Sequence, residues 1–234
     1  MEIKHLNFSY KNKEIFADFN AKFIADQLNV IIGGNGAGKT TLLNLIYGFI
    51  DRPATAMIGF PSMPNIIYKF QNMSFFDELT VKQVINFFKS MNDHTVTITN
   101  AQTRFYNEII KGLVNTKLRS LSGGEYQSVM VYCTSIMERE LYLFDEPLSG
   151  IDSYIENLIL DLIVSLVVEK KKKVIMTLHQ LDKLNSMQAH IVFVGNKKCV
   201  FQGNLSQMLQ AADTDDIDIA FKKMRSGNIL LKQE

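Results

Sequence analysis

The chain has 234 residues, a length that fits one domain or one domain with a subdomain. Hydrophobic residues make up 47% of it, which is ordinary for a globular protein with a real core. Its 25 lysines and arginines almost balance its 24 acidic residues. Because the net charge is close to zero, it gives no electrostatic reason to expect a lipid-headgroup partner, and we expect no nucleic acid as a partner either.

The cysteines and the apolar segments bear on the compartment. Cys133 and Cys199 have no paired spacing and no histidine cluster beside them, which favours two small core thiols in a reducing compartment. The first residues lack the basic start and apolar stretch of a signal peptide. The longest apolar run, residues 158–168, is too short to span a bilayer and contains Asp161. We therefore expect a cytoplasmic chain without a direct membrane span, which reaches a membrane only through a partner.

The first part of the chain predicts strands that lead into a glycine-rich loop and a helix. Loose alternation and a short apolar run are typical of strands, and helical spacing follows the loop. In chain order we expect strands at 2–10, 15–24 and 28–32, the loop at 33–40 and a helix at about 40–50. The stretch 51–65 holds three prolines and predicts a loop with one edge strand.

The rest of the chain alternates between helices and strands. In chain order we expect a strand at 66–70, helices at 80–91 and 101–113, a turn feeding a helix at 121–138, a strand at 141–145, a helix at 153–170, a strand at 173–178, a hairpin at 190–204 and a small helix at 205–212. We interpret the four lysines at 170–173 as a solvated helix cap, because positive charge is favoured at a helix C-terminus. The last twenty residues are only weakly patterned.

This order of elements predicts an α/β fold. Strands that alternate with helices across residues 28–178 favour a parallel sheet covered on both faces. The two helices between Gln71 and Ser122 interrupt that rhythm, so we interpret them as an α-helical subdomain inserted into the sheet domain. We place this subdomain at about 72–121, inside a domain of residues 1–212, and leave 213–234 as a C-terminal tail of unassigned role.

The loop GGNGAGKT has the spacing and the context of a phosphate-binding loop between a strand and a helix. Its glycines let backbone N–H groups curl around an anion without Cβ clashes. Lys39 would reach the β- and γ-phosphates, the Thr40 hydroxyl would bind Mg²⁺, and Thr41 with the helix dipole would support the α-phosphate. The expected ATP-binding residues of this loop are Gly33, Asn35, Gly36, Gly38, Lys39, Thr40 and Thr41. A glycine-rich turn that binds nothing is the alternative, and the flanking strand and helix disfavour it.

Two acids follow the apolar strand LYLF. Acids at the carboxyl end of a buried strand lie beside the phosphate loop in such sheets. Asp145 fits a Mg²⁺ ligand, usually through water, and Glu146 fits the carboxylate that polarises the attacking water. The alternative is one metal-binding aspartate beside a surface glutamate.

Two further polar residues end predicted strands. Gln71 follows the strand at 66–70, and we assign it both to catalysis and to Mg²⁺ binding. His179 follows the strand at 173–178, which should lie next to the strand that carries the acids. From there its imidazole could donate a hydrogen bond to charge developing on the γ-phosphate. A lone histidine at a strand end is more often structural.

The stretch LSGGEYQ, residues 121–127, predicts a second seat for a phosphate. Ser122 supplies a hydroxyl, and Gly123 and Gly124 leave the backbone bare at the start of a helix, where N–H groups are free to bind an anion. A domain of this size rarely binds two nucleotides, so the second seat raises the question of whose phosphate it holds.

Together these motifs resemble the nucleotide-binding subunit of ATP-binding-cassette (ABC) transporters, and the resemblance covers about residues 2–209. In that family LSGG is the signature sequence, and two cassettes stack head to tail so that each signature clamps the γ-phosphate held by the other cassette. The resemblance thus implies a P-loop core sheet with an N-terminal antiparallel β-subdomain and an inserted helical subdomain. It also implies ATP hydrolysis with Mg²⁺, a second cassette of the same or a different chain, transmembrane permease subunits, and a peripheral place at the inner face of the cell membrane.

Other segments match the family more weakly. Tyr10 matches the aromatic residue that stacks on adenine, although a core or rim aromatic is the alternative. LSGID at 148–152 resembles the family's D-loop, which would place Ser149 and Asp152 at a dimer interface. Residues 75–88 resemble the start of the helical subdomain, and its phenylalanines are a candidate dock for the membrane partner. These candidates are Phe75, Phe76, Phe87 and Phe88, of which two or more could simply fill the subdomain core.

Two positions depart from the family pattern. Glu125 stands where glutamine is commonest, and Ser128 stands where an arginine is usual. Glu146 and His179 are both present, so we expect ATP hydrolysis to be intact. The short segment after the first helix and the wording LFDEPLSGID favour, by analogy, a bacterial exporter of peptides or antibiotics. The alternatives are a soluble, non-transport member of the family, such as a cluster-assembly ATPase, and a P-loop kinase, which LSGG and His179 disfavour.

Overall fold

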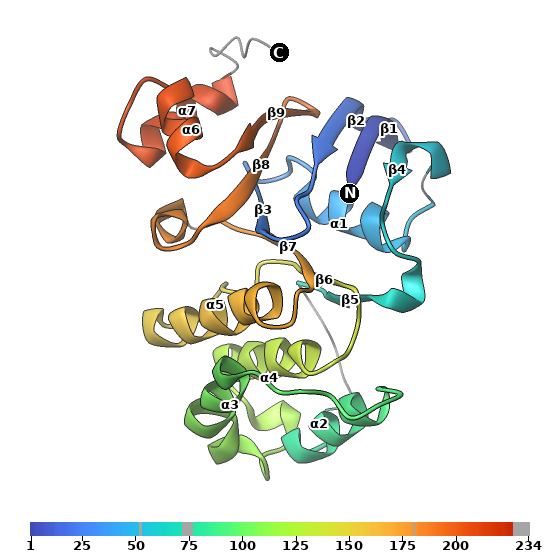
Figure 1. Cartoon of the computed structure of the whole chain (residues 1–234), viewed down its shortest axis with the longest axis vertical. Helices are drawn as coiled ribbons and strands as arrows, with labels where there is room; N and C mark the ends of the chain where they lie inside the picture. Colours follow the sequence, from blue (N-terminus) through green and yellow to red (C-terminus); the bar gives the residue numbers. More distant parts are fainter. Residues whose placement is uncertain (52, 72–76, 180, 227–234) are drawn as a thin grey trace. The chain divides into compact units, whose positions relative to one another are not determined.

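The computed structural model describes residues 1–51, 53–71, 77–179 and 181–226 (Figure 1). The chain divides into two compact units, Met1–Met63 with Ile175–Glu234, and Pro64–Val174. Each unit is described by itself below. Across the described ranges, no helix combines the length and the apolar character needed to cross a membrane.

The first unit contains the expected antiparallel β-subdomain. Strand β1 (Glu2–Tyr10) lies between β2 (Lys13–Lys22) and the two-residue β4 (Met57–Ile58). In the β1–β2 pairing Leu6 faces Phe19, and these side chains and Phe16 are fully buried. Apolar residues on one face of an antiparallel pair are typical of a sheet with one wet side. The pairing of β4 with β1 confirms the edge strand predicted within residues 51–65.

The first unit also contains the strand that leads into the glycine-rich loop. β3 (Leu28–Gly33) pairs in parallel with β8 (Ala189–Gly195), and β8 forms the predicted hairpin with β9 (Lys198–Gly203). Every residue of β3 is buried, as its continuous apolar run predicts. The loop after β3 ends at α1 (Lys39–Tyr47). This strand–loop–helix order is the context that a phosphate loop needs.

The C-terminal part of the first unit corrects the sequence analysis. After α6 (Leu205–Ala211) the chain forms a further helix, α7 (Ile217–Ser226), where we assigned no element. Figure 1 shows the two helices side by side. Ala220 and Met224 are buried, one turn apart, and the Phe221 ring lies 4.9 Å from that of Phe193 in β8. Packing of α7 against β8 and the rest of the first unit therefore stabilises this helix, because its sequence pattern alone is weak.

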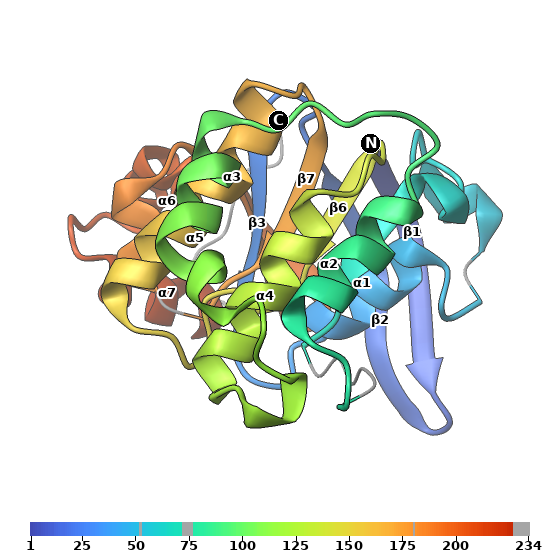
Figure 2. The same cartoon turned by 90° about the horizontal axis from the view of Figure 1, so that it is seen from below.

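Within its described residues, 64–71 and 77–174, the second unit pairs two parallel strands and packs four α-helices. Its strands are β5 (Ile66–Lys69) and β6 (Leu141–Phe144), and its helices are α2 (Val81–Ser90), α3 (Asn100–Phe105), α4 (Gly123–Ser135) and α5 (Ser153–Val168). Helix α4 contacts α2, α3 and α5, as Figure 2 shows. α3 continues through wider and tighter turns to Leu113, so the predicted helix at 101–113 is right in extent but is not uniform.

Strand β7 (Lys173–Thr177) runs from the second unit into the first. At its start, in the second unit, the Lys173 N–H donates to the Glu140 carbonyl just before β6. Just after its end, in the first unit, the Leu178 N–H donates to the Ile31 carbonyl of β3. The expectation that this strand neighbours the acid-bearing strand is therefore confirmed at its start.

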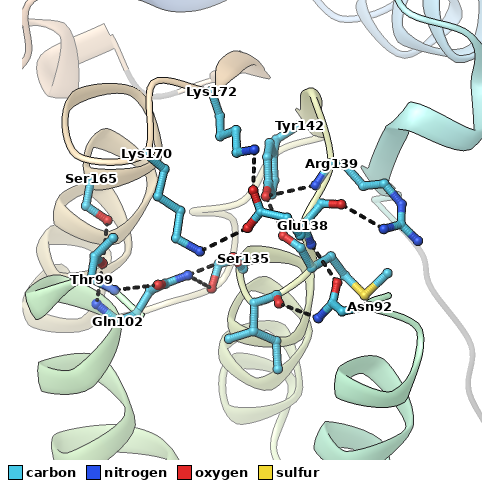
Figure 3. Close-up of polar contacts among 12 residues, drawn as sticks. Asn92, Thr99, Gln102, Ser135, Glu138, Arg139, Tyr142, Ser165, Lys170 and Lys172 are labelled. Atoms are coloured by element: carbon cyan, nitrogen blue, oxygen red, sulfur yellow. Dashed lines mark hydrogen bonds and ion pairs between the residues drawn. The ribbon is translucent and has the colours of Figure 1, made fainter. Parts of the chain in front are cut away.

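The lysine run 170–173 is solvated only in part: Lys171 is exposed as we predicted, but Lys170 and Lys172 are not. The Lys170 side chain is only 7% exposed, with its ammonium 3.8 Å from Glu138, and Lys172 also pairs with Glu138 (Figure 3). Tyr142 donates to the Met137 carbonyl in the same cluster. Glu138 offers a nearby carboxylate, and ion pairing offsets part of the cost of removing the amines from water. The cluster ties the end of α5 to the segment that enters β6.

Candidate nucleotide site

The glycine-rich loop forms a compact turn at the start of α1. Gly38 precedes the helix with φ 104°, and a Cβ there would lie 2.9 Å from atoms of Ile15 and Phe16, so only glycine fits. The buried ammonium of Lys39 donates to the Gly33 carbonyl at 2.9 Å and to the Gly34 carbonyl at 3.4 Å. Asn35, Gly36 and Thr40 are exposed, which leaves the loop's outer face accessible to a ligand.

Arg225 contacts this loop, and Tyr10 and His179 are the other expected site residues of the first unit. A Cβ on Gly34 would lie 3.3 Å from Nε of Arg225, so the last described turn of α7 rests against the loop. Tyr10 is 44% exposed at the end of β1, and its ring meets Phe8 edge to face. That exposure is what a ring needs to stack on a base. His179 is exposed, next to Leu178, whose N–H bonds to the strand that carries the loop.

The second unit brings together two of the residues expected in catalysis. Asp145 and Glu146 follow β6, and the Asp145 side chain is fully buried. The Gln71 amide Nε2 donates to Glu146 Oε2 at 2.8 Å, so two residues 75 positions apart in the sequence meet in one site. Glu146 has φ 47°, in the left-handed region that a non-glycine residue rarely occupies. Such strain persists only where the surroundings hold it, and it is common at functional sites.

Lys69 is a residue of this site that sequence reasoning missed. It lies on β5, is 1% exposed, and its ammonium donates to the Asp145 carbonyl at 3.5 Å. Burial lowers the pKa of Lys69 to about 8, and the neighbouring charges of Asp145 and Glu146 limit that fall. The sequence feature that could have indicated a role for Lys69 is its place in β5, a short strand that is otherwise apolar. The arrangement gives the two acids a fixed cation in addition to any metal ion.

We expect Lys69→Met to change how stability depends on pH. The folded pKa of Lys69, about 8, lies below its ordinary value of 10.5, so between these pH values the unfolded chain binds more protons. The free energy of unfolding of the wild type should therefore rise relative to Lys69→Met from pH 8 to 10.5, by up to about 3 kcal/mol. Urea unfolding of both proteins across this range measures the difference. Parallel curves would contradict the assignment of a buried, charged lysine.

The signature stretch forms the start of α4, also in the second unit. Ser122 caps the helix, accepting from the Glu125 N–H at 3.3 Å, while Glu125 Oε2 accepts from the Ser122 N–H at 2.7 Å. This reciprocal cap explains why glutamate serves at a position where glutamine is commonest, since either side chain accepts that bond. Ser122 and Gly123 are exposed, and nothing lies within 4 Å of a Cβ added to Gly123. The Ser122 hydroxyl keeps its own proton to donate to an anion.

The structure gives the surroundings of three other expected residues. Phe88 is buried and belongs to the core of its unit, whereas Phe87 is 48% exposed. Phe75 and Phe76 lie outside the described residues. Asp152 caps α5, accepting from the Tyr154 and Ile155 N–H groups, so its carboxylate already has partners within the chain.

Comparison with known proteins shows the family of the chain. A family model described as ABC transporter matches residues 16–149, more than half of the chain. The chain therefore belongs to the ABC transporter family, as its ATP-hydrolysing, ATP-binding subunit.

Its relatives share both length and fold. The thiamine import ATP-binding protein ThiQ of Brucella suis is 27% identical over 97% of each chain. The energy-coupling factor transporter ATP-binding protein EcfA1 of Thermotoga maritima is 27% identical over 94% of this chain and 87% of its own. A solved ATP-binding subunit of an ABC transporter superposes with a TM-score of 0.78 at 19% identity, covering 95% of this chain and 98% of that one. These neighbours confirm the fold class: a P-loop core with an antiparallel β-subdomain.

Proposed function

We propose that the chain powers transport through separate membrane-embedded subunits by dimerising around two ATP molecules. The observation that carries this proposal is the exposed phosphate seat at Ser122 and Gly123, in a chain that already has a phosphate loop at residues 33–40. Two seats per chain make two shared sites per dimer. A solved cassette of similar fold, TM-score 0.70, is a dimer in a post-hydrolysis state with ADP and phosphate, which supports this reading.

Each site residue has a proposed role. The loop with Lys39 binds the phosphates, Tyr10 stacks on the adenine, and the partner's LSGG closes over the γ-phosphate. Glu146 polarises the attacking water, Gln71 orients Glu146 through the observed hydrogen bond, and His179 donates to the developing charge. With the γ-phosphate gone, the two cassettes lose the group that joins them and separate.

The donor set also suits Mg²⁺. The buried carboxylate of Asp145, the hydroxyl of Thr40 and the amide oxygen of Gln71 are hard oxygen donors of the kind that Mg²⁺ prefers. We propose that these three residues hold the ion, which would neutralise charge on the phosphates when bound. In the described part of the chain no group of three or more His, Cys, Asp or Glu could hold a metal ion by itself. Phosphate oxygens and water would therefore complete its coordination.

The direction of transport has support on both sides. The sequence favours a small exporter by analogy, whereas relatives named for thiamine and molybdenum carry import in their names. Because these relatives cover most of the chain, we favour import of a small substrate as the first hypothesis to test. We keep residues 72–121 as the helical subdomain that passes closure of the dimer to the permease at the inner membrane face. A soluble, cluster-assembly-like ATPase remains the second candidate.

Copurification tests this proposal. The tagged protein is expressed in its source cells, and the membranes are solubilised gently. We expect a multi-span membrane protein in stoichiometric amount, together with ATP-dependent phosphate release. Recovery with soluble partners alone, and none from the membrane fraction, would move the assignment to the non-transport branch while leaving the ATPase in place.

A further inference from the structure

The catalytic turn is held from three directions within the second unit. The Glu146 carboxylate accepts from Gln71, and the carbonyl that precedes Glu146 accepts from Lys69. The carbonyl of Glu146 itself accepts from the Gln127 side-chain amide at 2.9 Å and from the Ser149 N–H at 3.2 Å. These contacts fix the side chain and both flanking peptide groups of a residue with strained backbone.

Unlike the other residues that donate hydrogen bonds to the Glu146 turn, Gln127 belongs to α4, the helix that begins at the signature stretch. It lies in the second turn of α4, five residues after Ser122, and is half-buried. An α-helix moves as a stiff body over such a short span, because each turn is fastened to the next by backbone hydrogen bonds. A shift of the signature end of α4 therefore displaces the Gln127 amide as well.

A second contact joins the same two segments. A Cβ added to Gly124 would lie 3.3 Å from the Gly150 carbonyl oxygen, so the helix start packs closely on the turn that follows Glu146. The turn from Glu146 to Gly150 thus meets α4 at Gly124 and at Gln127. Close-packed contacts of this kind transmit small displacements instead of absorbing them.

We propose that Gln127 is a positioning residue for Glu146, and that through it a phosphate bound at Ser122 in the signature sets the geometry of the chain's own catalytic carboxylate. The inference rests on the proposed function, in which that phosphate belongs to the partner's ATP. Each chain then hydrolyses its own ATP only when its signature also binds the γ-phosphate of the ATP held by the partner. Two sites linked in this way give ATP hydrolysis that is cooperative in ATP concentration.

The test is Gln127→Leu in the full-length chain, which keeps the bulk of the side chain but removes the donor. We expect kcat to fall about 10- to 100-fold, because the carboxylate loses its fixed position relative to the water it activates. The Kd for ATP should stay within about twofold, since no proposed nucleotide contact is removed. The Hill coefficient for ATP should fall toward 1. If Gln127 had only a structural role, its loss would lower ATP affinity and melting temperature together with kcat and the Hill coefficient.

Two further variants make the result interpretable. Gln210→Leu, the same change at an exposed position on α6, is the matched control and should match the wild type. Gln127→Asn keeps a shorter amide donor, should retain part of the activity, and serves if the leucine variant does not fold. Unchanged kcat and Hill coefficient in Gln127→Leu, or equal losses of kcat, ATP affinity and melting temperature in both Gln127 variants, would overturn the inference. If the wild type itself releases no phosphate from ATP, the proposed function fails instead.

Discussion

Glu146→Gln is expected to lower ATP hydrolysis by about 10²- to 10⁴-fold, the range typical for loss of a general base. The amide has the shape of the carboxylate, and its oxygen can still accept the bond from Gln71, so the site should stay assembled. ATP binding should therefore persist. Since the γ-phosphate is not removed, the closed dimer should accumulate. Phosphate release measures the first effect, and light scattering with and without ATP measures the second.

The control for this experiment is Glu169→Gln, the same change at an exposed glutamate that ends α5. It should hydrolyse ATP at the wild-type rate. A Glu146→Gln variant that still turns over ATP at more than about a tenth of the wild-type rate would exclude Glu146 as the base. A variant that is inactive but stays monomeric with ATP would count against a shared site between identical chains, and would favour a different cassette as the partner.

Lys39→Ala is expected to weaken ATP binding by about 10²- to 10³-fold, which corresponds to losing one or two hydrogen bonds from a charged donor. The ammonium already lies across the loop, bonded to the Gly33 and Gly34 carbonyls, so it is positioned where phosphates would bind. Titration of a fluorescent ATP analogue measures the affinity.

The alanine variant also leaves empty the space that the buried Lys39 chain fills, so a second variant is needed. Lys39→Met keeps the packing of the buried chain without the charge and should bind as weakly as the alanine variant. Lys222→Ala, at an exposed lysine of α7, is the matched control. Wild-type affinity in both Lys39 variants would contradict the assignment of residues 33–40 as the phosphate loop.

The parts of the site that sequence could predict are those whose chemistry is written in consecutive residues. A loop that wraps a phosphate needs glycines and a lysine at fixed spacing, so GGNGAGKT is recognisable without a structure. The same holds for LSGG before a helix and for two acids after an apolar strand. Their chemical roles stay predictions, although the bond between Gln71 and Glu146 places two of them together.

Lys69 and Gln127 could not be predicted in the same way, because their importance arises from contacts with distant residues. Lys69 is 76 positions from Asp145, whose carbonyl it binds, and Gln127 is 19 positions from Glu146, whose carbonyl it binds. Tertiary contacts also explain the misread lysine run and the missed α7. Glu138 draws the run into a half-buried cluster, and Phe193 and its neighbours hold a helix whose polar sequence gave no clear pattern.

The division of the chain into two units has a consequence for the order of events on the ribosome. The second unit, 64–174, is one continuous stretch, so all of its residues have emerged once synthesis passes residue 174. The first unit needs segments from both sides of that stretch: β3 pairs with β8, and Gly34 rests against Arg225. Domains fold as units once their residues are available. The glycine-rich loop is therefore made well before the segments that support it, and a nascent chain should gain affinity for ATP only after residues up to about Arg225 have emerged.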